Sequence, residues 1–253
     1  MTESISSGIK NKISDLPIKN VGGSRVRGNK KVGSLENPLI TVITVAFNSE
    51  LTIEDTITSV IHQEYSNIEY IIIDGGSSDA TLDIIRRYDE KIDYWVSEKD
   101  SGIYDAMNKG IALATGDYVG MLNSDDYFSD SSVMNKIVSG ILYSNADAVF
   151  SCLDIVDPRN IDRVVRKYRV SRFSLFMLRI GVMPPHPTFY CRKSCYEKAG
   201  VYRTDFRIAA DFEMMVRFLI KEAISWYFID AVTVKMRAGG VSSGGINSSF
   251  VVN

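Results

Sequence analysis

Residues 117–128 read DYVGMLNSDDYF, and an apolar run from Tyr118 to Leu122 leads into two adjacent aspartates, Asp125 and Asp126. The run is typical of a buried strand. Like charges side by side at a strand end repel each other, so the pair is either a solvated turn that caps the following helix or a set of ligands for a positive group. Vicinal carboxylates suit a hard divalent cation such as Mn²⁺ or Mg²⁺, which takes oxygen ligands and commonly bridges to phosphates.

The segments around this stretch alternate between β-branched apolar runs and helical patterns. Strands buried on both faces are predicted at LITVITVAF (39–47), IEYIIID (68–74), IDYWV (92–96) and DYVGML (117–122). Helices are predicted after Asn48-Ser49, after GGSSD (75–79) and over 104–114. This alternation predicts right-handed βαβ units and a parallel sheet.

The second half of the chain is less regular. A helix is predicted over 131–144 and a strand over 146–156, followed by a basic segment, 159–179. Further along, the patterns indicate a strand near Thr188–Cys191, a helix from Asp211 to Lys221, and strands near 226–229 and 232–236. The fold class predicted is α/β, with one Rossmann-like domain on a central, mostly parallel sheet and a mixed C-terminal half.

The boundaries follow from composition. Residues 1–37 lack a sustained apolar period and are predicted to be a mobile basic arm. The domain is predicted over 38–237, divided into a first half (38–130) and a second half (131–237), with a mobile tail at 238–253.

Composition points to a cytoplasmic protein. The chain is 45% hydrophobic with a net charge of −2, which gives no whole-chain argument for nucleic-acid binding. Its three cysteines have no C-x-x-C spacing, which favours reduced thiols. No run approaches the roughly 18 apolar residues of a membrane span, and no signal peptide is expected.

Polar clusters follow each of the first four predicted strands. They are Phe47-Asn48, Asp74-Gly75-Gly76, Glu98-Lys99-Asp100 and Asn123-Ser124-Asp125-Asp126. Because ligands of open parallel sheets bind outside the carboxyl ends of the strands, these clusters predict one site at that edge. Their convergence favours the cation interpretation of the aspartate pair over the turn.

The chain resembles the inverting nucleotide-sugar glycosyltransferases of family 2, which have the GT-A fold, and within them the bacterial branch that builds cell-surface polysaccharides. The matching stretches appear in family order: ITVITVAFNSE (40–50), IIIDGGSSDAT (71–81), EKDSGIYDAMNKGIALATGDYVGMLNSDDYF (98–128), PPHPTFYCRKSCYEKAGVY (184–202) and IAADFEMMVRF (208–218).

The resemblance implies a role for each matching position. Asp126 would ligate a divalent cation, with Asp125 nearer the ribose or sharing the metal, and Asp211 would be the catalytic base. The donor would be a nucleotide-diphosphate-sugar, bound by the half 38–130. The acceptor would be a glycan or lipid-linked glycan, bound by the half 131–237. The nucleotide-sugar site would comprise Ala46, Phe47, Asn48, Asp74, Asp105, Asn108, Asn123 and Asp125, and His186 would lie on the acceptor side.

Other interpretations stay open from the residues alone. Asp211 could simply cap its helix, His186 could be structural, and Asp105 could cap a helix or line the donor pocket. The basic segment 159–179 could be a solvated, helix-lined acceptor subdomain or a contact with the anionic inner face of a membrane. The alternatives to a transferase are a non-catalytic sugar- or partner-binding domain and, less favoured, a sugar-nucleotide pyrophosphorylase.

Overall fold

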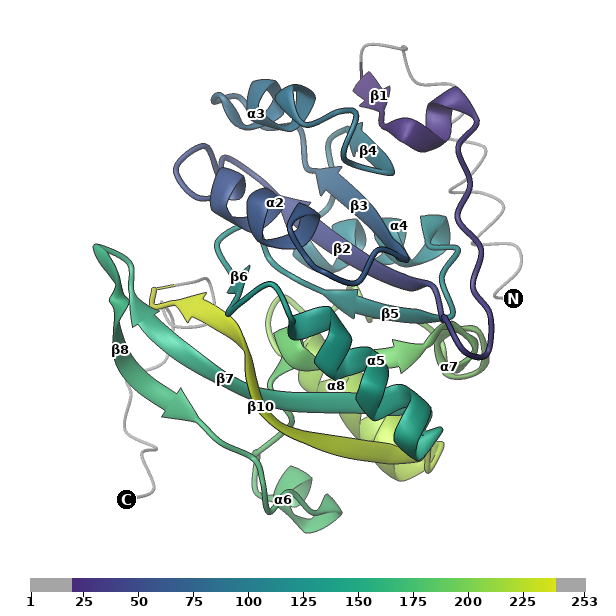
Figure 1. Ribbon diagram of the computed structural model, residues 1–253. Helices are drawn as coiled ribbons and strands as arrows, with labels where there is room; N and C mark the ends of the chain where they lie inside the picture. The colour runs from purple at the N-terminus through teal and green to yellow at the C-terminus, as the bar shows by residue number, and fades with distance from the viewer. Residues whose placement is uncertain (1–19, 240–253) are drawn as a thin grey trace.

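The computed structural model describes residues 20–239 and is built on a ten-stranded sheet (Figure 1). The strand order is β1-β4-β3-β2-β5-β9-β7-β10-β6, with β8 paired to β7. The strands are β1 (Val21–Gly22), β2 (Ile40–Ala46), β3 (Ile68–Asp74), β4 (Tyr94–Ser97), β5 (Tyr118–Met121), β6 (Tyr127–Phe128), β7 (Ala148–Asp157), β8 (Asn160–Tyr168), β9 (Tyr190–Arg192) and β10 (Trp226–Arg237).

The first half of the sheet is parallel and the second half is mixed. β2 pairs in parallel with β3 and β5, and β3 pairs in parallel with β4. The antiparallel strand β9 then joins β5 to β7, which pairs in parallel with β10. The predicted α/β class is confirmed, and the two predicted strands at 226–229 and 232–236 form one long strand with irregular pairing between Phe228 and Val234.

Helices cover both faces of this sheet. One face packs against α2 (Ile53–Ile61), α3 (Thr81–Arg87) and α5 (Val133–Ser144). The other packs against α4 (Ile103–Leu113), α7 (Lys193–Ala199) and α8 (Ala210–Val216), and α8 continues as a π-helical turn, η4 (Arg217–Lys221). The remaining short elements are η2 (Ser24–Arg27), α6 (Leu175–Arg179) and η3 (His186–Thr188). No helix among residues 20–239 is long and apolar enough to cross a bilayer.

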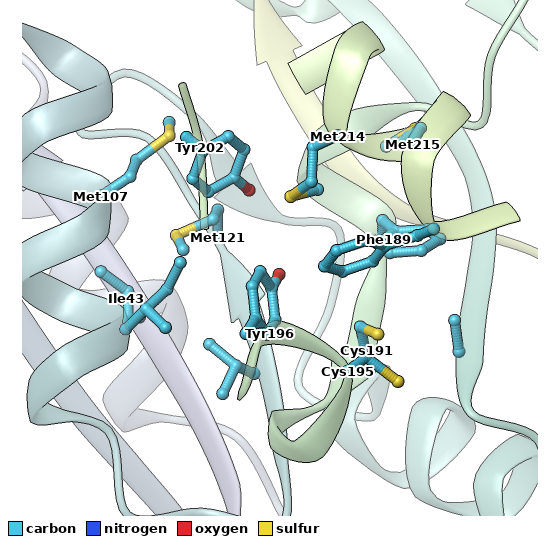
Figure 2. Packing of buried hydrophobic residues seen from close by; sticks show 14 of the residues in the cluster. Ile43, Met107, Met121, Phe189, Cys191, Cys195, Tyr196, Tyr202, Met214 and Met215 are labelled. Atoms are coloured by element: carbon cyan, nitrogen blue, oxygen red, sulfur yellow. The ribbon is translucent and has the colours of Figure 1, made fainter. Parts of the chain in front are cut away.

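Alternation along β2 supplies both cores. Ile43 and Val45 face the α4 side, whereas Val42 and Ala46 face the α2 side. On the α4 side, Met107, Met121, Phe189 and Met214 join the same cluster (Figure 2). A Cβ on Gly110 of α4 would lie 2.4 Å from Ile43 Cγ2, so only a glycine lets α4 approach β2 this closely.

The predicted N-terminal arm is wrong for residues 20–37, which belong to the folded domain. β1 pairs antiparallel with β4, and Lys31 Nζ lies 2.8 Å from Asp93 Oδ2. Arg25 Nη1 donates to Glu69 Oε1 (2.7 Å) and to the Leu113 carbonyl (2.9 Å). This segment is polar because it pairs with buried carboxylates, so its composition resembles that of a linker. Residues 1–19 of the predicted arm and 240–253 of the predicted tail lie outside the described residues.

The basic segment 159–179 differs from the helix-lined alternative. Its first part is β8, which forms an antiparallel hairpin with β7, and only α6 is helical. Nearly every side chain of β8 is exposed. The segment therefore presents an edge strand in which apolar and basic residues are interspersed.

Replacing Arg25 with alanine tests whether residues 20–37 stabilise the domain. Glu69 is buried, so removing its guanidinium partner leaves a poorly compensated charge. We expect a loss of about 3 kcal/mol in the free energy of unfolding, at the low end for a broken buried pair, because Thr41 and Thr115 still donate to Glu69. Urea denaturation measures this.

The matched control is Arg27→Ala, which removes a more exposed ion pair with Asp89. This change should cost about 0–1 kcal/mol. Equal small losses for both variants would contradict the assignment of residues 20–37 to the core of the fold.

Candidate functional site

The carboxyl ends of β2, β3, β4 and β5 lie along one edge of the sheet. Ala46 at the end of β2 is in register with Asp74 at the end of β3, and Asp74 is in register with Ser97 of β4. The strand order reverses on either side of β2, because β3 and β4 lie on one side and β5 on the other. Open α/β sheets bind ligands at such a reversal point, so the geometry defines the candidate site.

The loops after β2 and β3 hold each other in place. Asn48, in a left-handed conformation (φ 49°), accepts a hydrogen bond at Oδ1 from the Ser78 amide (2.9 Å). The Asn48 amide in turn donates to Ser77 Oγ (2.8 Å). Among the residues predicted here to bind nucleotide, Asn48 therefore holds the two loops together, and Ala46 is buried. Phe47 has a side chain that is 63% exposed.

Asp74 is fully buried and acts on the same loops. Its carboxylate accepts hydrogen bonds from the amide of Ser77 (3.1 Å) and from the hydroxyls of Ser77 and Ser97 (2.5 and 2.6 Å). Both oxygens are thus used by the protein itself. Asp74 orders the turn that borders the site.

The aspartate pair lies directly after β5, as predicted. Asp126 is 1% exposed, and its Oδ1 has no hydrogen-bond partner among the described residues. Its Oδ2 lies 3.5 Å from Asn123 Nδ2, at the limit of a hydrogen bond. Burial, and then the charge of Asp125, raise the pKa of Asp126 well above its usual value. A buried carboxyl in this state is stabilised by a proton or by a cation.

Arg237, at the end of β10, provides positive charge to this pair. Its Nη1 donates to the Asp125 carbonyl (2.7 Å), and its Nη2 forms an ion pair with Asp55 of α2. The guanidinium also lies over the Tyr127 ring, 5.0 Å from the centroid. Its charge opposes the rise in the pKa of Asp125 that burial causes. Sequence reasoning missed Arg237, because no local pattern links it to residues more than 100 positions earlier.

The side chains at this edge fit a divalent-cation site in which the protein supplies only some of the ligands. No group of three or more His, Cys, Asp or Glu side chains within residues 20–239 could form an all-protein metal cage. Two adjacent carboxylates with an unused oxygen match Mg²⁺-type sites, which rely on one or two carboxylates and complete the coordination with phosphates and water.

The residues around Asp211 form a second cluster at the start of α8. Asp211 Oδ1 accepts a hydrogen bond from the Phe212 amide (2.9 Å) and lies 3.4 Å from the Tyr104 hydroxyl. That hydroxyl also accepts from the Ala210 amide (3.2 Å). Ala209, directly before the helix, has a left-handed backbone (φ 69°), which is uncommon for a residue with a side chain. The carboxylate is not a helix cap.

His186 lies beside this second cluster. Its Nε2 is 2.7 Å from the Tyr202 hydroxyl, and the Tyr202 ring stacks on that of Tyr104 with centroids 5.8 Å apart. Burial lowers the pKa of His186, while the charge of Asp211 opposes that change. Burial therefore favours the neutral imidazole, which lies close enough to Asp211 to interact with its charge.

Asn108 and Asp105 of α4 have supporting positions. Asn108 exchanges two hydrogen bonds with the backbone of Tyr202 (2.8 and 2.9 Å), so both polar atoms of its amide join α4 to that segment. Asp105 Oδ2 accepts from the Ser101 amide (3.0 Å). Lys109, itself buried, bridges Asp105 (3.5 Å) and Glu98 (2.7 Å).

The first turn of α4 thus connects the two clusters. Asp105 holds the loop that follows β4, while the adjacent Tyr104 contacts Asp211. The structure brings Phe47, Asn48, Asp74 and the aspartate pair to one edge, and it brings Asp211 and His186 together beside it. Tyr104 and Tyr202 were not predicted, although Tyr104 lies within the matching stretch 98–128.

Comparison with known proteins identifies the class. The sequence profile of glycosyl transferase family 2 matches residues 41–207. The chain belongs to this family. It is 37% identical over 185 residues to an uncharacterized glycosyltransferase of Mycobacterium tuberculosis, covering 71% of this chain and 68% of the relative. A PGL/p-HBAD biosynthesis glycosyltransferase of Mycobacterium bovis is 24% identical over 219 residues, or 85% of this chain and 83% of that protein.

Solved structures support the GT-A fold. S. aureus TarS 1-349 in complex with UDP-GlcNAc matches with a TM-score of 0.69 and 19% identity, over 82% of this chain and 61% of that one. The mannosyltransferase PcManGT from Pyrobaculum calidifontis, in complex with GDP-Man and Mn²⁺, matches with a TM-score of 0.61 and 18% identity, over 97% of this chain and 70% of that one. The predicted family and fold are confirmed, and the bacterial sources of these curated relatives fit the predicted branch.

Proposed function

We propose that this protein is a metal-dependent, inverting glycosyltransferase that moves a sugar from a nucleotide diphosphate to a hydroxyl of a glycan or lipid-linked acceptor in cell-surface polysaccharide synthesis. The observation that carries the proposal is the buried Asp126 carboxyl, whose Oδ1 has no partner among residues 20–239, at the reversal point of the sheet. Complexes of the structural neighbours with UDP-GlcNAc and with GDP-Man and Mn²⁺ support a nucleotide-sugar donor.

Each carboxylate has a separate task in this proposal. Asp125 and Asp126 would hold a divalent cation, which supplies charge stabilisation for the leaving diphosphate. Asp211 would accept the proton of the acceptor hydroxyl as its oxygen bonds to the anomeric carbon and the bond from that carbon to the phosphate oxygen breaks. Attack opposite to the leaving diphosphate inverts the anomeric configuration.

The cluster around Asp211 supports its role as the base. Tyr104 and the Phe212 amide orient the carboxylate through Oδ1, which leaves Oδ2 without a partner among the described residues. The left-handed Ala209 sets the start of α8, and strained backbone of this kind often occurs at functional sites. His186 would take the acceptor side as a positioning residue, since its Nε2 is bound to Tyr202.

The first prediction concerns the metal. Asp126→Asn preserves size but removes the charge that attracts a cation. Calorimetric titration of UDP and of GDP, each with and without Mn²⁺, should show that Mn²⁺ strengthens binding to the native protein. The variant should lose about tenfold or more of that affinity.

Asp130→Asn is the matched control, because Asp130 is an exposed acid in the next turn of chain that pairs with Lys136. It should retain the Mn²⁺ effect. Undiminished Mn²⁺-dependent binding by a folded Asp126→Asn protein would rule out this metal site.

The second prediction concerns the base. Asp211→Asn retains shape and hydrogen bonding but cannot accept the proton, and general-base catalysis typically contributes about 10²–10⁴-fold. Turnover of donor should fall by that factor, with nucleotide affinity nearly unchanged. The control is Glu213→Gln, two residues along the same helix, where the side chain pairs with Arg217. If the Asp211→Asn variant turns over within about threefold of the native rate, Asp211 is not the base.

The β8–α6 surface supports peripheral contact with an anionic membrane. It carries basic side chains along β8 together with the exposed apolar residues Val165, Leu175, Phe176 and Ile180. Each basic residue near an anionic surface contributes about 1 kcal/mol of attraction, and apolar side chains can enter the interface. Such contact would bring a lipid-linked acceptor to the site.

Charge reversal tests this surface. Glutamate at Arg166, Lys167 and Arg172 should greatly reduce co-sedimentation with phosphatidylglycerol vesicles at low salt, because the attraction is electrostatic. A triple reversal at Arg86, Arg87 and Lys91, on and after α3 at the opposite end of the molecule, is the control (Figure 1). The proposal is wrong if the native protein does not bind these vesicles, or if both triple variants bind equally well.

A further inference from the structure

The loops after β2, β3 and β4 meet at Phe47, Gly75 and Asp100. A Cβ on Gly75 would lie 2.4 Å from Asp100 Oδ2 and 3.4 Å from Phe47 Cδ2. Gly75 does not have a left-handed backbone, unlike its neighbour Gly76 (φ 82°), so its backbone would accept a side chain. The Asp100 carboxylate therefore fills the space that a side chain at position 75 would need.

One oxygen of this carboxylate is unused by the protein. Oδ1 accepts a hydrogen bond from the Gly102 amide (2.9 Å), whereas no residue between 20 and 239 donates to Oδ2. The cation whose charge acts on Asp100, Lys109, has its Nζ within 2.7–3.5 Å of Glu98, Asp105 and the Lys99 carbonyl. Burial raises the pKa of Asp100, because the charged carboxylate loses hydration and its Oδ2 has no donor among the described residues to replace that water.

An exposed aromatic ring lies beside this free acceptor. The Phe47 ring and Asp100 Oδ2 both border the position that a Cβ on Gly75 would occupy, and the ring is exposed. An aromatic face provides stacking for a nucleobase, and an acceptor at the edge of the stack provides selection among bases. The two together form a base-binding corner at the edge where the proposed function places the nucleotide.

We propose that Asp100 Oδ2 accepts the ring N–H of the donor nucleobase and so restricts the donor to uridine, thymidine or guanosine diphosphate sugars. Uracil, thymine and guanine present a ring N–H next to a carbonyl. Cytosine and adenine present an unprotonated ring nitrogen at the corresponding edge, which a carboxylate repels. This inference rests on the proposed function, because it requires a nucleotide at the carboxyl edge of the sheet.

Calorimetry with five nucleotide diphosphates tests the assignment. With Mn²⁺ present, the native protein should bind at least one of UDP, dTDP and GDP about tenfold or more tighter than CDP and ADP, since an unpaired acceptor penalises the wrong base. In Asp100→Asn that ratio should fall to within about threefold, mainly through weaker binding of the preferred nucleotide, because an amide can present either a donor or an acceptor.

Moving the carboxylate provides a matched rescue. Asp100→Gly alone should lose base selectivity. Adding Gly75→Asp should restore it, because the first change vacates the space that the new side chain needs. Glu90→Gln, a distant acid that follows α3, should behave as the native protein. Thermal denaturation of each variant separates a folding defect from a binding defect.

The outcomes separate this inference from the proposed function. If the native protein binds none of the five nucleotides, the proposed function fails. If it binds them without preference, prefers CDP or ADP, or keeps its preference in folded Asp100→Asn and Asp100→Gly proteins, the assignment of Asp100 is wrong and the proposed function stands.

Discussion

The organisation of this protein depends on keeping two adjacent carboxylates at the end of a buried strand. Asp126 lies against the core with one oxygen unused, and Asp125 is its immediate neighbour. Burial of charge without a partner is costly, so such a pair persists only where positive charge is supplied. The protein supplies part of it through Arg237, and the proposed cation would supply the rest. Arg237 reaches Asp125 because β10 pairs antiparallel with β6, with Lys235 in register with Tyr127.

Local pattern was sufficient to predict the parallel part of the sheet. The β-branched runs at 40–46 and 68–74 are buried along their whole length, as expected for parallel strands between helical layers. Since the carboxyl ends of parallel strands lie at one edge, the sequence also placed Asp74 and the aspartate pair together. A pattern with period 2 or 3.6 carries this information within a few residues, without long-range contacts.

The parts that sequence reasoning missed depend on contacts distant in the chain. Arg25 bonds to Glu69 and Arg237 bonds to Asp125, and each partner is distant in the chain. Within its own stretch of sequence, each arginine looks like a solvated surface side chain. The same applies to β8, whose exposed residues lack the alternating burial that marks a strand. Tyr104 and Asn108 lay in a matching stretch, but only the structure assigns one to Asp211 and the other to the Tyr202 backbone.

The two clusters share one support, which has a consequence for mechanism. The first turn of α4 orders the loop after β4 through Asp105 and touches the second cluster through Tyr104. A nucleotide that contacts that loop would therefore act on the same rigid helix that orients Asp211. Such an arrangement keeps the proposed base and the leaving group in fixed relation, which favours in-line displacement.

Paramagnetic broadening of amide signals by Mn²⁺ is the most direct test of the account, because it locates the metal without assuming a sugar or an acceptor. With a nucleotide diphosphate present, broadening should centre on residues 123–126 and extend to the adjacent loops after β2, β3 and β4. Asp126→Asn should abolish that pattern. Broadening centred elsewhere on the molecule, or a pattern that the variant leaves unchanged, would contradict the account.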